Sequence, residues 1–188
     1  MKKLALYICV LMGMPSVFGQ ELQLPSGNQY LADSEFLIMP TYAGIGNNVR
    51  VRLSATSQWV GFKEAPDYQS LSGDMRLGNR SGLGLSLYND RNGYTKQMGA
   101  KATFSHHLTL DSYDSHFVSF GISYLLNAFR IDIDKFTEAG RPRADAAVTD
   151  NRAMINHNFE VGVLYRYKGI FASLAATNIL NKNKEMFD

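Results

Sequence analysis

Apolar and polar residues alternate along most of the chain, and the longest alternating run extends from Gly93 to Leu110. Its apolar side includes Met98, Ala100, Ala102 and Phe104. Its polar side includes Gln97, Lys101 and Thr103. Successive side chains of a strand point to opposite faces, so this period of two predicts one strand with an apolar and a polar face. Strands of soluble sheets usually have about five or six residues, and this one is much longer.

The same alternation predicts six further strands, within residues 48–62, 67–78, 81–94, 117–134, 159–169 and 170–180. Trp59 is assigned to the apolar face of the first of them. Asn92-Gly93 suits a hairpin turn, and Lys168-Gly169 indicates another tight turn. Because no helical crossover separates the strands, the sequence predicts an antiparallel meander of about seven strands. The alternation fails from Lys135 to Asn156, which predicts a long loop.

Strand length and composition favour a membrane barrel over a soluble sandwich. A transmembrane strand needs about nine to eleven residues, which the predicted strands supply. The polar faces are rich in Gly, Ser, Thr, Gln and Arg, which suits a crowded or wet lumen. Aromatic residues lie near the strand ends, as in an interfacial girdle: Trp59, Phe62, Tyr88, Tyr94, Phe117, Tyr165 and Tyr167. We therefore predict an all-β, antiparallel up-and-down outer-membrane β-barrel with its apolar face toward lipid.

The strand number predicts an incomplete barrel. Bacterial single-chain barrels normally have an even number of strands and no open edge. About seven strands leave two open edges, so we expect this chain to hold the N-terminal portion of a longer barrel. The long loop is expected on the extracellular side, where the long loops of such barrels lie.

The N-terminus predicts export. Residues 1–19 have two lysines, an apolar run and small residues before Gln20, which is typical of a cleaved signal peptide. Cys9 lies inside the apolar run, which disfavours a lipoprotein signal. Cleavage removes the only cysteine and excludes thiolate chemistry. It also lowers the formal net charge from +2 to zero, so no basic excess suggests a nucleic-acid partner. Residues 20–47 are predicted as an irregular segment and residues 48–188 as the barrel strands.

Polar residues along the strands raise three possible site chemistries. Ser105, His106 and His107 with Asp111 suggest a rim hydrolase, but neighbouring strand residues point to opposite faces, so His106 and His107 cannot share one site. Metal ligands could come from His106, His107, His116 and His157, and calcium ligands from Asp111, Asp114, Asp132 and Asp134. Neither set has the spacing of a known ligand motif. We predict no catalytic, cofactor or metal site.

Two further groups on the polar face are interpreted structurally. Arg50 and Arg52 share one face and are expected to point into the lumen. There they would pair with Asp74, with Glu160, or with the N-terminal segment; substrate contact is the alternative. Gly82 and Gly84 are expected to make room in a narrow lumen or to let the strand bend.

Three motifs, in order, resemble the PorP/SprF family. Met39–Gly44, "MPTYAG", resembles its Asn-Pro-Ala-Tyr-Ala-Gly signature, with Met39 in place of Asn and Thr41 in place of the first Ala. "RVRLSATSQW" resembles its Arg-rich strand that ends in Gln-Trp. "GLGLSLYNDRNG" resembles its Gly-x-Gly strand and Asp-Arg-x-Gly turn. The resemblance extends over about residues 24–180.

The resemblance implies an outer-membrane barrel of the type IX secretion and gliding machinery, whose members are usually longer chains. It implies a non-enzymatic role in exporting or holding a secreted adhesin-like protein, with outer-membrane lipid and other secretion components as partners. A general small-solute porin or stand-alone small barrel is the alternative, and a barrel hydrolase is a third class.

Overall fold

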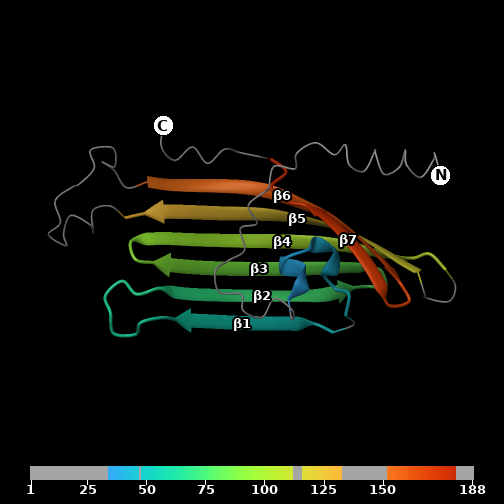
Figure 1. Cartoon of the computed structure of the whole chain (residues 1–188), viewed down its shortest axis with the longest axis horizontal. Helices are drawn as coiled ribbons and strands as arrows, with labels where there is room; N and C mark the ends of the chain where they lie inside the picture. The colour runs from blue at the N-terminus through green and yellow to red at the C-terminus, as the bar shows by residue number, and fades with distance from the viewer. Residues whose placement is uncertain (1–33, 47, 112–115, 133–151, 181–188) are drawn as a thin grey trace, which may run out of the picture.

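The computed structural model of the chain describes residues 34–46, 48–111, 116–132 and 152–180. These residues form one seven-stranded antiparallel sheet in which each strand pairs with the next in sequence (Figure 1). The strands are β1 (Arg50–Ser57), β2 (Asp67–Leu77), β3 (Ser81–Asn92), β4 (Thr95–Thr109), β5 (His116–Ile131), β6 (Arg152–Tyr167) and β7 (Ile170–Ala176). The predicted all-β, up-and-down meander is confirmed. Among the described residues β1 and β7 remain unpaired with each other, so the sheet is not closed, which is consistent with a barrel-type fold.

Two strand boundaries differ from the prediction. β6 begins at Arg152 rather than Phe159, so residues 152–156 belong to a strand and not to the predicted loop. The sequence does not alternate regularly there. On the inner face, apolar Met154 is followed by polar Asn156 and Asn158, and on the apolar outer face His157 is polar. Register with β5 holds this part of β6 extended. The rest of the predicted loop lies outside the described residues.

The second difference is at the end of β1. The strand stops at Ser57, and Trp59 lies in the following loop with φ of 51°, so its assignment to the apolar face of the strand was wrong. A positive φ cannot continue an extended strand. The alternation in the sequence therefore continues past the end of β1.

The connections gather at two ends of the sheet (Figure 1). One, the turn end, has the connections 78–80, 110–115 and 168–169. The other, the loop end, has the connections 58–66, 93–94 and 132–151, and lies on the left in Figure 1. The two longest connections of the sheet are thus both at the loop end.

The two faces of the sheet have opposite chemistry. One, the outer face, presents large apolar side chains that are each 40–53% exposed, among them Leu85, Met98, Phe104, Ile122 and Val163. The other, the inner face, buries polar side chains that are each 0–9% exposed, among them Ser72, Lys101, Thr103, Ser123 and Glu160. A soluble domain buries its apolar residues. This reversal confirms the predicted placement of Met98 and Phe104 opposite Lys101 and Thr103, and it suits a sheet whose apolar face meets lipid.

Two members of the predicted aromatic girdle point inward instead. Tyr88 lies on the inner face, where its hydroxyl donates to Asn127 Oδ1 at 3.0 Å. Phe117 lies on the inner face as well, under the guanidinium of Arg166 at 4.7 Å from the ring centre. Both follow from strand parity, because their neighbours Leu87 and Val118 face outward. No helix in the described part of the chain is long and apolar enough to cross a membrane.

Candidate functional site

The described residues before the first strand lie across the inner face of the sheet, toward the turn end (Figure 1). We call its described part, Ser34–Gly46, the inner segment. It contains two short 3-10 helices, η2 (Glu35–Leu37) and η3 (Pro40–Tyr42), and η3 contacts β4, β5 and β6. Phe36, Thr41 and Ala43 are at most 1% exposed. The inner segment thus occupies the inner face beside the strands.

Glycines on the strands make room for this segment. A Cβ at Gly82 would lie 2.1 Å from the Ala43 carbonyl oxygen, and one at Gly84 would lie 2.7 Å from the Phe36 ring. At Gly121 a Cβ would meet the backbone of Pro40 at 2.4 Å. Any other residue at these positions would push the segment off the sheet. The prediction that Gly82 and Gly84 make room in the lumen is confirmed, and the inner segment fills that room.

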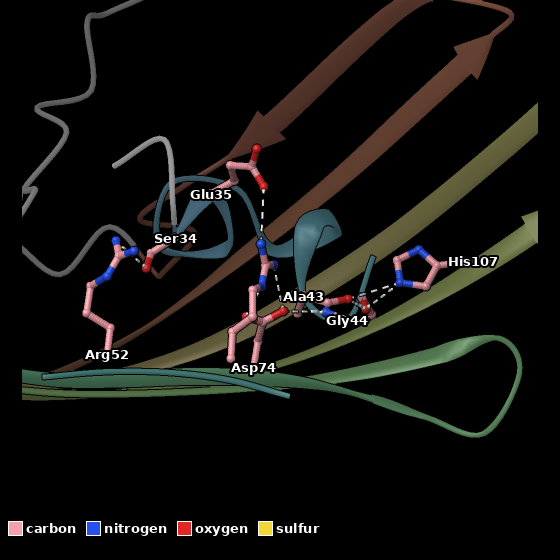
Figure 2. A network of polar contacts seen from close by, with 9 residues as sticks. Ser34, Glu35, Ala43, Gly44, Arg52, Asp74 and His107 are labelled. Atoms are coloured by element: carbon pink, nitrogen blue, oxygen red, sulfur yellow. Dashed lines mark hydrogen bonds and ion pairs between the residues drawn. The ribbon is translucent and has the colours of Figure 1, made fainter. Parts of the chain in front are cut away.

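Arg50 and Asp74 hold the end of the segment (Figure 2). Arg50 donates from Nε and Nη2 to the two carboxylate oxygens of Asp74, at 2.9 and 2.8 Å. The same carboxylate accepts the backbone N–H of Gly44 at 2.9 Å. Gly44 has φ of +65°, a conformation that favours glycine. A bidentate arginine–carboxylate pair is a strong and directional contact, and here it also binds the segment's backbone.

The start of the segment is bound by the same two arginines. Arg50 Nη1 lies 3.9 Å from Glu35 Oε2, and Arg52 Nη1 donates to Ser34 Oγ at 3.4 Å. The predicted pairing of these arginines with Asp74 and with the N-terminal segment is confirmed. Glu160, the other predicted partner, pairs with Lys101 instead.

Lys101 and Glu160 form a second contact, in the middle of the sheet. Their side chains are each 10% exposed, and Lys101 Nζ lies 2.5 Å from Glu160 Oε2. Lys101 Nζ also donates to the Leu37 carbonyl at 2.8 Å. A buried charge is tolerated only when it is paired and hydrogen-bonded, and these two contacts meet that condition. The lysine thereby ties η2 to β4 and β6.

Ser105 and His107 form the third contact, at the Ala43 carbonyl (Figure 2). Ser105 Oγ donates to this oxygen at 2.5 Å, and His107 Nε2 lies 3.0 Å from it. The other ring nitrogen, Nδ1, lies 2.9 Å from Ser119 Oγ. With Nε2 protonated, the imidazole donates to the carbonyl and accepts from Ser119.

This arrangement differs from the hydrolase triad considered above. Ser105 and His107 do share a face, with Oγ and Nε2 3.2 Å apart, but the histidine is oriented by a serine and both groups point at a backbone carbonyl. His106 lies on the opposite face, with Nδ1 3.1 Å from Ser81 Oγ. Asp111 accepts the backbone N–H of His116 at 3.1 Å. These contacts position the inner segment.

Among the described residues, the histidines and aspartates considered as metal ligands do not converge. No group of three His, Cys, Asp or Glu with metal-binding geometry occurs among residues 34–46, 48–111, 116–132 and 152–180. His116 Nδ1 instead contacts the Tyr165 hydroxyl at 2.9 Å. Asp114 and Asp134 lie outside the described residues. The expectation of no catalytic, cofactor or metal site stays a prediction.

Sequence reasoning missed several members of these contacts, among them Ser34, Glu35, Ala43 and Ser119. Strand periodicity does not mark Ser34, Glu35 or Ala43, because they lie in an irregular segment. The one available signal was the Met39–Gly44 motif, which proves to be the buried half of the inner segment.

The comparisons with known proteins agree with this architecture. The family model described as type IX secretion system membrane protein PorP/SprF matches residues 19–188. No curated protein and no solved structure matches the chain.

Proposed function

The chain belongs to the PorP/SprF family of type IX secretion system membrane proteins, and from this premise we propose that it supports export or surface attachment of a secreted, adhesin-like protein. Its partners are then that protein, other components of the secretion system and the lipid of the outer membrane. The family and the β-rich fold with its apolar outer face fit an outer-membrane location. The gliding machinery is the wider assembly in which such a component would act.

The observation that supports this role over a porin is the inner segment. It lies on the polar face that would otherwise line a water-filled channel, and charged and glycine contacts hold it there. A diffusion pore needs an open lumen whose side chains set selectivity. A barrel whose lumen is occupied by its own chain is better suited to binding a protein than to passing solutes.

A deletion strain tests this role. We expect loss of the protein to leave a specific surface protein unexported or shed into the medium, while uptake of small antibiotics is unchanged. Surface proteins are measured by mass spectrometry of whole cells and of culture medium, and a strain complemented with the wild-type chain is the control. Reduced antibiotic uptake with surface proteins in place would favour the porin instead.

Orientation and export follow from the same proposal. We propose that residues 1–19 are a signal peptide and that the loop end faces the cell exterior, since extracellular loops are the long ones. The mature N-terminus, determined by mass spectrometry, is then Gln20. An epitope tag at Arg143 is expected to bind antibody on intact cells; binding only after membrane disruption would reverse the orientation.

A further inference from the structure

Charged side chains on the outer face are confined to one row. Among the described strand residues, every Lys, Arg, Asp or Glu of the outer face lies at the loop end, in adjacent register positions: Asp67, Arg91, Lys96 and Arg130. Arg91 is the register partner of Lys96, and Lys96 that of Arg130. We call these three cations the basic row. The outer face of the turn end has no such row and presents Tyr165, Tyr167 and Ile170.

The basic row is unfavourable by itself. Residues directly opposite on antiparallel strands have Cβ atoms about 4.5–5.5 Å apart, and like charges in such pairs repel. All three side chains are exposed. Asp67 is the register partner of Arg91, but its carboxylate accepts from Gln69 at 3.1 Å. Within the described part of the chain, no ion pair is found for Arg91, Lys96 or Arg130. An anion lying between them would remove the repulsion.

A hollow for such an anion lies beside the row. It has a volume of about 170 Å³ and is lined by the three cations together with Gly93 and Tyr94 of the β3–β4 turn and Thr95 at the start of β4. Two acidic residues from the adjoining loops, Glu64 and Asp132, also line it, so the cations outnumber the acids by three to two. A cavity of roughly 10–15 Å³ already holds one water, so this one has room for a small anionic group. The guanidinium groups supply the forked donors that match phosphate oxygens.

The position of the row relative to the apolar band identifies the kind of anion. The next outer-face row toward the turn end contains Met98, and the following one contains Leu87 and Leu126. On β4 the outer-face residues from Met98 to Leu108 are apolar except His106, over about 34 Å along the strand at roughly 3.4 Å per residue. At the usual strand tilt of about 35–45°, this spans close to the ~25 Å of an apolar barrel band. The basic row therefore lies at the level of the lipid headgroups.

From these observations we propose that Arg91, Lys96 and Arg130 bind the phosphate of an anionic lipid headgroup in the leaflet at the loop end. Lipid phosphate is favoured over a phosphorylated protein because the side chains leave the lipid-facing side of the sheet directly above its apolar band. It is favoured over a free phosphate ion because the acyl chains would pack on the apolar rows below. Basic clusters next to membrane-spanning elements bind anionic headgroups in this way.

Lipid binding by the purified full-length chain in detergent tests the proposal. The probes are phosphatidic acid and phosphatidylcholine, and native mass spectrometry measures the lipid retained. We expect the wild-type chain to retain phosphatidic acid in preference. The triple variant Arg91→Gln, Lys96→Gln, Arg130→Gln should bind it more than tenfold more weakly, since each basic residue near an anionic surface contributes about fivefold in affinity. The control, Lys168→Gln in the turn-end connection 168–169, should bind as the wild type does.

Three results would overturn the proposal. They are equal retention of the two lipids, binding of phosphatidic acid by the triple variant within twofold of wild type, and displacement of phosphatidic acid by equimolar inorganic phosphate. If the triple variant does not fold, the three single variants carry the test, each with about fivefold weaker binding expected. The export role rests on the family and the inner segment and is tested separately by the deletion strain.

Discussion

At the residue scale, the inner segment contains one polar atom that its surroundings do not satisfy. Thr41 is 0% exposed, and its hydroxyl oxygen has no hydrogen-bond partner among the described residues. Its methyl group packs near Gly162. The family signature that Met39–Gly44 resembles has Ala at this position, and alanine has no hydroxyl to bury. A buried hydroxyl without a partner costs about 1–3 kcal/mol.

We expect Thr41→Val to raise the free energy of unfolding by about 1 kcal/mol, because the substitution keeps the packed methyl group and removes the unsatisfied hydroxyl. The matched control is Thr103→Val, which removes the partner of Ser123 Oγ at 2.8 Å and should destabilise by a similar amount. Urea unfolding in lipid vesicles, followed by tryptophan fluorescence, measures both. The same sign for the two variants would contradict this account of Thr41.

Residue contacts were predictable only where opposite charges sit on one face. Arg50 and Asp74 are the example, because strand parity and charge together leave few partners. His107 is the counterexample. Parity places it inside, but its partner is the Ala43 carbonyl, which lies 64 positions away and carries no side-chain signal. The contact depends on where an irregular segment folds back, and no periodicity encodes that.

At the element scale, the strands and their faces were predictable because the period of two is strong. The period of two gave a wrong prediction at two places. At Trp59 the alternation continues into a loop, and at the start of β6 the strand lacks a regular alternation. In β6 the neighbouring strand sets the conformation through register, so non-local pairing overrides a weak local pattern.

The face assignment predicts a contrast between two nearby positions of β4. Ala100→Arg places a charge in the apolar band and should cost about 2–4 kcal/mol. Gln97→Arg is the control, because Gln97 lies on the inner face, donates to the Tyr88 hydroxyl at 3.0 Å and can be replaced by another donor. Thr103 is unsuitable because it is 3% exposed. Folding yields in lipid vesicles measure the contrast, and equal yields would refute the face assignment.

At the scale of the whole molecule, three separate contacts bind the inner segment to the inner face of the sheet. Asp74, Lys101 and Ser105 with His107 each bind a different backbone group of the segment, at Gly44, Leu37 and Ala43. The strand glycines let these contacts form by allowing the two backbones to approach. Fold class and the polarity of the inner face followed from periodicity, whereas the position of the inner segment on that face required the structure.

Unseating the segment is therefore expected to open the lumen. Gly82→Ala places a Cβ 2.1 Å from the Ala43 carbonyl oxygen, and because both groups belong to backbones the segment must shift. We expect this variant to fold, to lose about 1–3 kcal/mol of stability, and to expose the segment to protease. Its single-protein conductance in planar bilayers should exceed that of the wild type, since the polar inner face would then line a water-filled path.

Gly169→Ala is the control, because a Cβ there meets nothing within 4 Å. If Gly82→Ala proved susceptible to protease but conducted no better than the control, the inner segment would serve to present a binding surface, and closure of the lumen would have to come from elsewhere in the chain.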